Sequence, residues 1–229
     1  MGMAIADYWK NGKAERLRVF SPDFDEDEIP VDVLFRNYAD MPRIEQKALD
    51  LAEGRILDVG AGAGCHSLAL QDKGKDVIAI DISPLSVRIM GERGVEKARL
   101  QDFWETTERF DTILMLMNGI GIIGKVGNLG KFFSHIDEIL AQEGQLLLDS
   151  SDIAYVFETD EGIIELPPGD GYYGELEYQM QYKDIKGDCF SWLYLDAETL
   201  ATAADVAGFR CEIIEEGEHY EFLARITRK

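Results

Sequence analysis

The stretch Leu57-Asp58-Val59-Gly60-Ala61-Gly62-Ala63-Gly64-Cys65-His66-Ser67 decides how this chain folds. It begins in an apolar run, passes through three glycines at alternate positions, and ends in residues that suit the first turn of a helix. Glycine allows a tight backbone turn and lets a ligand approach the backbone closely. The first turn of a helix adds N–H groups that have no partner within the helix. The stretch therefore predicts a buried strand, a ligand-binding turn and a helix.

Short apolar runs alternate with helical segments from residue 55 onward. Strands that are apolar throughout are typical of a parallel sheet with both faces covered. Ser83 and Pro84 suit a helix start with Gly94 at its end, and Asn128 begins another helix that we expect Gly144 to end. This alternation predicts a doubly wound α/β sheet. The predicted strands are residues 56–59, 77–80, 98–100, 112–117, 146–148, 210–214 and 220–226.

Two segments lie outside this alternation. Residues 1–54 are polar and indicate a helical cap in front of a domain at residues 55–229. The acidic run 23–28 within the cap favours a solvated loop or a helix start over a cation site. Residues 151–194 form an insertion that we expect to cover the active site as a lid. It has loop chemistry at 167–171 and a predicted β-hairpin with strands at 175–183 and 189–195 around a turn at 184–188.

The composition excludes several classes of function. The chain's 229 residues suffice for one large domain, or for a domain with a cap. Its net charge is 23 − 44 = −21, and so acidic a surface repels phosphate backbones and anionic lipid. The sequence shows no disulfide framework, no zinc cluster and no secretion signal. It also has no apolar run of the roughly 20 residues that span a membrane. We therefore expect a cytoplasmic monomer or homodimer that binds neither nucleic acid nor membranes.

Three predicted strands end in residues that can bind parts of a nucleoside. The first strand runs into the glycine turn, the second ends at Asp81 and the third ends at Asp102. A carboxylate after the second strand can accept both hydroxyls of a ribose, and one after the third can accept an adenine amino group. Plainer roles stay open, because Asp81 could only precede the Ser83 cap and Asp102 could cap a helix that begins near Phe103. A nucleoside site accounts for all three strand ends together.

The glycine spacing points to a particular cofactor. The three glycines stand at positions one, three and five of the turn, whereas a dinucleotide turn has them at one, three and six, where this chain has Cys65. An acid just before the turn suits an amino group better than a pyrophosphate. The pattern resembles the first motif of the class I S-adenosylmethionine-dependent methyltransferases. The resemblance rests on residues 56–67, Asp81, Asp102 and residues 111–119.

This resemblance implies a fold and an activity. The expected seven-stranded, mostly parallel sheet has the order 3-2-1-4-5-7-6, with its last strand antiparallel. The expected reaction is the transfer of a methyl group from S-adenosyl-L-methionine to a small-molecule acceptor by in-line displacement, with S-adenosyl-L-homocysteine as the product. Three alternatives stay open: a nicotinamide-dependent oxidoreductase, an aminopropyltransferase on the same fold, and a cofactor-binding protein without activity.

The resemblance also assigns roles to residues around the turn. The glycines would pass under the methionine part of the cofactor, and Asp58 would lie near its ammonium group or order the turn. Asp81 would bind the ribose, and Asp102 would accept the adenine amino group. Of the histidines, His66 could reach the site or have no role, whereas we expect His135 to be solvated and His219 to be structural. The expected cofactor-binding residues are Asp58, Gly60, Ala61, Gly62, Gly64, His66, Asp81, Ile82, Asp102, Phe103, Met117 and Asn118.

The acceptor is expected beyond the fifth strand. Asp149, Ser151 and Asp152 follow that strand, with Tyr38 as a further substrate residue; helix capping at 152–154 is the alternative for Asp152. We name no catalytic residue, because only a protonated acceptor needs a base. We expect no metal, because the acid set of a catechol-type magnesium site is incomplete. Residues 151–229 carry 18 acidic and 6 basic side chains, and such surroundings would suit an amine-bearing acceptor. The candidate lid residues are Tyr8, Trp9, Phe35, Arg36, Tyr38, Tyr172, Tyr173, Tyr178, Tyr182 and Trp192.

Overall fold

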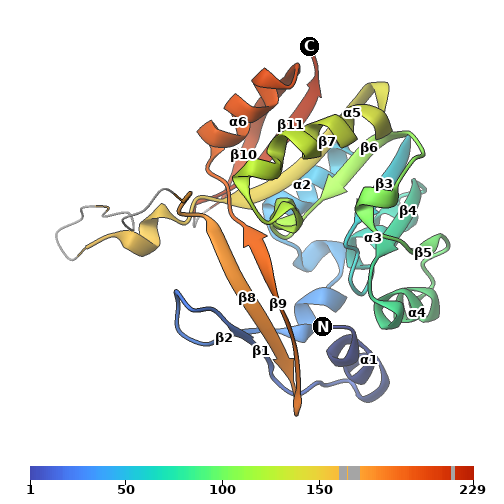
Figure 1. Cartoon of the computed structure of the whole chain (residues 1–229). Coiled ribbons are helices and arrows are strands. Elements are labelled where there is room, and N and C mark those ends of the chain that lie inside the picture. Colours follow the sequence, from blue (N-terminus) through green and yellow to red (C-terminus); the bar gives the residue numbers. More distant parts are fainter. Residues whose placement is uncertain (160–163, 165–170, 218–219) are drawn as a thin grey trace.

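The computed structural model describes residues 1–159, 164, 171–217 and 220–229. Within these residues a central sheet contains seven strands: β3 (Arg55–Val59), β4 (Asp76–Asp81), β5 (Ala98–Leu100), β6 (Phe110–Met115), β7 (Leu140–Ser151), β10 (Phe209–Glu216) and β11 (Glu221–Arg228). Their order is β10-β11-β7-β6-β3-β4-β5 (Figure 1). The five strands from β3 to β7 pair in parallel, and β11 is antiparallel to both of its neighbours. The predicted order 3-2-1-4-5-7-6 and its antiparallel last strand are therefore confirmed.

Helices cover both faces of this sheet. Leu57 of β3 packs in a cluster with residues of α5 (Leu129–Ile139) and α6 (Ala197–Val206). Its neighbour Ile56 packs in a separate cluster with residues of α2 (Arg43–Leu51) and α3 (Cys65–Asp72). Successive side chains of a strand point to opposite faces, and here each face is covered. This two-sided burial explains why the strands are apolar throughout.

Side-chain caps fix where several helices begin. The Ser83 hydroxyl accepts the N–H of Ser86 at 3.2 Å at the start of α4 (Pro84–Arg93), and Gly94 follows with a φ of 101°. The Asp196 carboxylate accepts the N–H of Thr199 at 2.8 Å at the start of α6. The predicted start of α4 at Ser83 and its end at Gly94 are confirmed. Among the described residues α5 is the longest helix with 11 residues, and no helix there has the length and apolar character to cross a membrane.

The predicted end of α5 at Gly144 is wrong. The helix ends at Ile139, and β7 begins at the next residue because Leu140 pairs with Phe110 of β6. Gly144 is instead buried within β7, where an added Cβ would lie 3.1 Å from the Asp111 carbonyl oxygen. Pairing with a neighbouring strand thus overrides the helical period of the sequence.

A second sheet joins the N-terminal segment to the insertion. Its order is β2-β1-β8-β9, and it lies to one side of the central sheet (Figure 1). Residues 1–54 are therefore not wholly helical: α1 (Gly2–Asn11) and α2 enclose β1 (Leu17–Phe20) and β2 (Asp27–Ile29). The predicted hairpin is present as β8 (Glu175–Tyr182) and β9 (Ile185–Leu193), with a turn of two residues instead of the expected five. Of the predicted loop at 167–171, all but Gly171 lies outside the described residues, as does His219.

Candidate active site

A cavity of about 780 Å³ lies at the carboxyl ends of the central strands. Gly60 follows β3, Asp81 ends β4, Asn118 follows β6 and Ser151 ends β7, and all four line the cavity. Its opposite wall comes from the second sheet, with Tyr178 of β8 and Trp192 of β9 among the lining residues. The carboxyl ends of strands in an open α/β sheet are where ligands bind, and here the second sheet encloses that edge.

The glycine turn leaves room for a ligand. Gly60 and Gly62 line the cavity and have φ values of 68° and 59°, which disfavour residues with side chains. A Cβ at Gly60 would meet no atom within 4 Å, and one at Gly62 would meet only the Gly60 carbonyl oxygen at 4.0 Å. Gly64 differs, because its Cβ would lie 2.8 Å from Val95 in the packing between helices. The first two glycines therefore face open space in the cavity, whereas the third serves packing; the cofactor contacts of all three stay a prediction.

Two carboxylates hold the turn in place. Asp58, 1% exposed, accepts the Ser67 hydroxyl at 2.6 Å, and burial raises the pKa of its carboxyl. Asp81 accepts the N–H of Gly62 at 2.9 Å and the N–H of Ser83 at 2.7 Å. Burial also raises the pKa of Asp81, and the hydrogen bonds from those two N–H groups offset part of that rise. Asp81 thus precedes the Ser83 cap and lines the cavity as well, and each of its oxygens keeps a second lone pair for a ribose hydroxyl.

The residues that follow β5 lie outside the described lining of the cavity. Asp102 caps a 3₁₀ turn at Phe103–Glu105, where its carboxylate accepts the N–H of Trp104 at 2.9 Å. Phe103 is 4% exposed and belongs to the main core. Neither residue is among the described residues that line the cavity, and neither is Ile82, which is 74% exposed. The adenine contacts of Asp102 and Phe103 stay a prediction. His135 is buried, not solvated as predicted, because its Nε2 bonds to the Phe103 carbonyl oxygen at 2.9 Å.

A buried ion network lies beside the glycine turn. His66 lines the cavity, and its Nε2 lies 2.8 Å from the Glu45 carboxylate on α2. Arg36 pairs with the same carboxylate, and both side chains of that pair are 7% exposed. Burial alone would raise the pKa of Glu45, but His66 and Arg36 together lower it. Glu45 is not among the residues predicted from the sequence, although an acid between Ile44 and Ala48 on an apolar helix face is a signal of a paired charge.

Asn118 connects two strands, β7 and β9, at the floor of the cavity. Its backbone N–H donates to Asp149 at 2.9 Å, its side-chain amide donates to the Leu193 carbonyl at 3.2 Å, and it accepts the Ser150 hydroxyl at 3.1 Å. Met117 and Asn118 both line the cavity and have positive φ values of 61° and 55°. Such values store strain in residues other than glycine and are common at functional sites. Burial raises the pKa of Asp149 to about 7, with the charge of Glu45 adding to the effect.

The predicted acceptor residues are only partly brought together. Ser151 lines the cavity, whereas Asp149 is bonded behind Asn118. Asp152 accepts the Ala154 N–H at 2.8 Å and the Tyr173 hydroxyl at 2.7 Å, so it caps the following turn, as the alternative proposed. Tyr38 lies elsewhere, with its hydroxyl 2.8 Å from Asp50 at the surface.

Aromatic residues close the cavity, but only some of those predicted. Tyr178 and Trp192 line it, whereas Tyr8 packs on Phe35 at a ring separation of 4.6 Å outside it. Among the residues that the structure describes, the acids at this end come from residues 25–27 and not from the C-terminal third. Among the described residues there is also no group of three or more His, Cys, Asp or Glu placed to hold a metal ion. The aromatic lining residues that the sequence analysis missed are Phe24, Tyr155, Phe190 and Tyr194.

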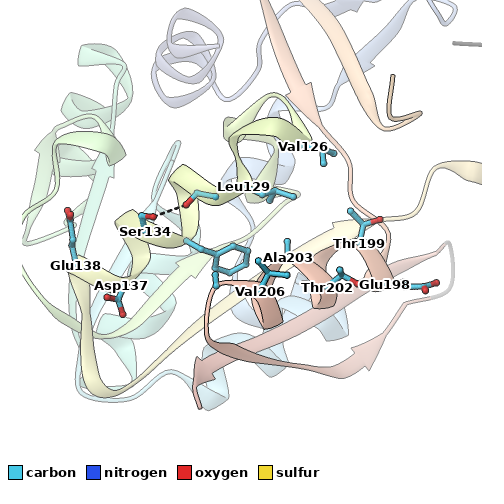
Figure 2. A pocket seen from close by; sticks show the side chains of 13 residues that line it. Val126, Leu129, Ser134, Asp137, Glu138, Glu198, Thr199, Thr202, Ala203 and Val206 are labelled. Atoms are coloured by element: carbon cyan, nitrogen blue, oxygen red, sulfur yellow. Dashed lines mark hydrogen bonds between the residues drawn. The ribbon is translucent and has the colours of Figure 1, made fainter. Parts of the chain in front are cut away.

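A second hollow, of about 860 Å³, lies between α5 and α6 (Figure 2). Its floor is apolar, with Leu129 and Phe133 from α5 and Ala203 from α6, and Asp137 and Glu198 lie at its rim. None of the residues predicted to bind cofactor or acceptor lines it. The glycine turn therefore marks the first cavity as the candidate active site.

Comparisons with known proteins agree with this geometry. The family model of a methyltransferase domain matches residues 34–213. An uncharacterised methyltransferase of Staphylococcus carnosus (strain TM300) is 40% identical over 221 residues, which are 93% of this chain and 98% of that protein. The crystal structure of a SAM-dependent methyltransferase from Bacteroides fragilis in complex with S-adenosyl-L-homocysteine is 54% identical. Its alignment covers 99% of this chain and 93% of that chain, with a TM-score of 0.93.

The fold also recurs at low identity. The CcbJ methyltransferase from Streptomyces caelestis is 14% identical, with a TM-score of 0.62 over 85% of this chain and 99% of that chain, so the likeness there is one of fold. The family model and the two similar relatives each span most of the chain, including the glycine turn and the strand ends around the cavity. This chain therefore belongs to the class I S-adenosylmethionine-dependent methyltransferases.

Proposed function

We propose that this protein transfers a methyl group from S-adenosyl-L-methionine to a small-molecule acceptor by in-line displacement. The observation that carries the proposal is one cavity with the glycine turn at one end and the aromatic side chains of the second sheet at the other. Its volume of about 780 Å³ lies in the range of roughly 300–1,000 Å³ that is typical of small-molecule sites. Because the second sheet covers this space, a small acceptor fits better than a macromolecular one.

The residues at the glycine end fit the methyl donor. Gly60 and Gly62 present bare backbone to the cavity, so the methionine part of the donor can lie against them. Asp58 and Asp81 supply carboxylate oxygens for an ammonium group and for ribose hydroxyls. Their negative charge also favours a sulfonium cation. We extend the proposal to Asp102, whose second carboxylate oxygen has no hydrogen-bond partner among the described residues and could accept the adenine amino group.

Methyl transfer requires mainly that the acceptor atom, the methyl carbon and the sulfur are aligned and that water is excluded. When bound, S-adenosyl-L-methionine supplies an electrophilic methyl carbon, to which an acceptor lone pair bonds as the carbon–sulfur bond breaks and its electron pair stays on sulfur. Asn118, which is bonded to β7 and β9, holds the floor of the cavity in one position. Trp192 packs directly on Gly121, where a Cβ would lie 2.1 Å from the indole ring. These fixed walls would orient the acceptor and displace water from the reacting atoms.

A labelling experiment tests the proposal. Purified protein is incubated with S-adenosyl-L-methionine that carries a tritiated methyl group, together with a small-molecule extract or, separately, with the macromolecular fraction of the same cells. We expect label in the small-molecule fraction. Label in the macromolecular fraction alone, or calorimetric binding of reduced nicotinamide dinucleotide in place of S-adenosyl-L-homocysteine, would contradict the proposal.

Gly60→Ala and Gly12→Ala are a matched pair of variants for this experiment. Both glycines have a φ of 68°, and a Cβ at either would meet no atom within 4 Å. The two therefore carry the same backbone strain, but only Gly60 lines the cavity. We expect Gly60→Ala to lose label transfer and Gly12→Ala to keep it.

A further inference from the structure

Aromatic rings line the end of the cavity opposite the glycine turn. Tyr178, Phe190 and Trp192 form a continuous row on β8 and β9, with ring centroids 6.2 Å apart between the first two and 6.0 Å apart between the last two. Phe24, Tyr155 and Tyr194 complete the aromatic lining. The faces of such rings attract apolar groups and cations and give nothing to an anion. We call Tyr178, Phe190 and Trp192 the aromatic wall.

Carboxylates lie at the same end. Asp25, Glu26 and Asp27, in and after the connection between β1 and β2, line the cavity. Glu26 is neutralised by Arg18, which donates to both of its oxygens. Asp27 uses its Oδ1 to accept the N–H of Glu28 at 2.7 Å. Burial raises the pKa of Tyr178, and interactions with Tyr194 and the charge of Asp27 add to that rise, so the Asp27 carboxylate lies near the Tyr178 hydroxyl.

Among the described residues, no Lys or Arg side chain lines this cavity. Its two basic groups, His66 and the Met1 amino group, lie toward the glycine turn, His66 beside Glu45 and the amino group near Asp81. Five of the described lining residues are Asp or Glu. Nearby arginines are already paired, Arg18 with Glu26 and Arg36 with Glu45. An acceptor that carried a carboxylate or phosphate would lose its hydration here without gaining a counter-ion. A cationic acceptor would gain both a counter-charge and aromatic faces.

We propose that the methyl acceptor carries a positively charged amine on an apolar body, and that the aromatic wall together with Asp25 and Asp27 recognises it. This inference rests on the proposed function, because it assigns a substrate class to the same cavity. The apolar body packs on the rings, and the two carboxylates supply the counter-charge. The net charge of −21 adds a long-range attraction that draws a cation toward the protein.

Isothermal titration with charge-matched probes tests the inference. The protein is first saturated with S-adenosyl-L-homocysteine. It is then titrated with 2-phenylethylamine, 2-phenylethanol and 3-phenylpropionate, and with the matching cyclohexyl series: cyclohexylmethylamine, cyclohexylmethanol and cyclohexanecarboxylate. We expect the amine to bind about tenfold more tightly than the alcohol in each series, and the carboxylate to bind most weakly. Equal affinities, a preference for the carboxylate, or no binding of either amine would overturn the inference.

Two variants assign the preference to the residues named. Asp27→Asn should weaken amine binding by about threefold to tenfold and leave alcohol binding unchanged, because it removes charge and keeps shape. Asp184→Asn, in the exposed turn between β8 and β9, is the matched control and should change neither. Thermal unfolding of each variant checks that it is folded. An amine preference that Asp27→Asn and Asp25→Asn together leave intact would overturn the assignment.

The failure of this inference can be told apart from the failure of the proposed function. The first titration, with S-adenosyl-L-homocysteine alone, reports on the methyl-donor end. Absence of binding there would overturn the proposed function, and the inference with it. Binding there without an amine preference would overturn the inference alone, and the methyltransferase assignment would stand.

Discussion

The two ends of the cavity are built in different ways. The end that we propose for the methyl donor is lined by backbone, because Gly60 and Gly62 follow a strand in the middle of the central sheet. At the acceptor end it meets side chains on a small antiparallel sheet whose edges are β2 and β9. A backbone surface can change little without moving a strand, whereas a side-chain surface changes with each substitution. The molecule thus combines a fixed donor site with an adaptable acceptor site, and the two should respond separately to mutation.

The largest effect should come from the ion network behind the donor end. Glu45→Ala removes the partner of both His66 and Arg36 and leaves a buried guanidinium uncompensated. Breaking a buried pair typically lowers the free energy of unfolding by about 3–5 kcal/mol. Urea denaturation measures this loss. The control is Glu215→Ala, which removes a partner of the exposed Arg43 and should cost about 1 kcal/mol or less. Equal losses in the two variants would show that the network does not support the donor end.

The next test asks whether the donor end is a backbone surface. A Cβ at Gly60 would occupy cavity space in which we propose that the methyl donor binds. Overpacking costs about 1–3 kcal/mol, so Gly60→Ala should weaken the binding of S-adenosyl-L-homocysteine by that amount. Calorimetry measures the affinity, and Gly12→Ala should match the unmodified protein. A ligand that binds Gly60→Ala with full affinity would lie elsewhere.

A carboxylate at the donor end gives an effect of similar size. Asp81→Ala removes the expected ribose contact and should weaken S-adenosyl-L-homocysteine binding by about 1–3 kcal/mol, as for hydrogen bonds to a charged group. Asp76→Ala, at the exposed start of the same strand, is the control and should leave the affinity unchanged. Unchanged affinity in Asp81→Ala would remove the ribose assignment.

A smaller effect is expected at the junction of the two ends, where Asp149 lies. Its pKa is raised by burial from the ordinary value of 3.8 to about 7 in the folded protein. The unfolded chain therefore loses this proton first, and the stability that the protonated carboxyl contributes at about pH 4 is lost as the pH rises to about 7.

Asp149→Asn keeps the shape of the protonated carboxyl but does not titrate. Relative to the unmodified protein it should gain about 1–2 kcal/mol in the free energy of unfolding between about pH 4 and pH 8, allowing for the partial exposure of the site. Denaturation at several pH values measures the difference. If the difference in unfolding free energy between the two proteins stays constant over this pH range, the pKa of Asp149 is not raised in the folded protein.

The donor end could be predicted from the sequence because its determinants are local. The strand, the glycine turn and the helix follow one another within residues 56–67, and Asp81 ends the next strand. Resemblance to a family then supplied the order of the sheet. Asp102 shows the limit of this reasoning, because the sequence left both a cap and an adenine contact open; the structure shows the cap, and the adenine contact stays a prediction.

The acceptor end could be predicted only in part: the hairpin with Tyr178 and Trp192 was visible in the sequence, but its pairing with β1 and β2 depends on distant contacts. β1 has four residues and β2 has three, too few to show a period, and β1 is fixed by β8, as in the pairing of Leu17 with Tyr182. Without that pairing, nothing in the sequence brings residues 24–27 next to Phe190. The end of α5 was missed for a similar reason, since pairing with β6 starts β7 at Leu140.

A crystal structure of the protein with S-adenosyl-L-homocysteine would be the sharpest test of a cavity with a donor end and an acceptor end. We expect the amino-acid part of the ligand over Gly60 and Gly62, its ribose at Asp81 and its sulfur directed toward Trp192 and the rest of the aromatic wall. A ligand bound in the hollow between α5 and α6, or an adenosine that occupies the aromatic end, would contradict this arrangement.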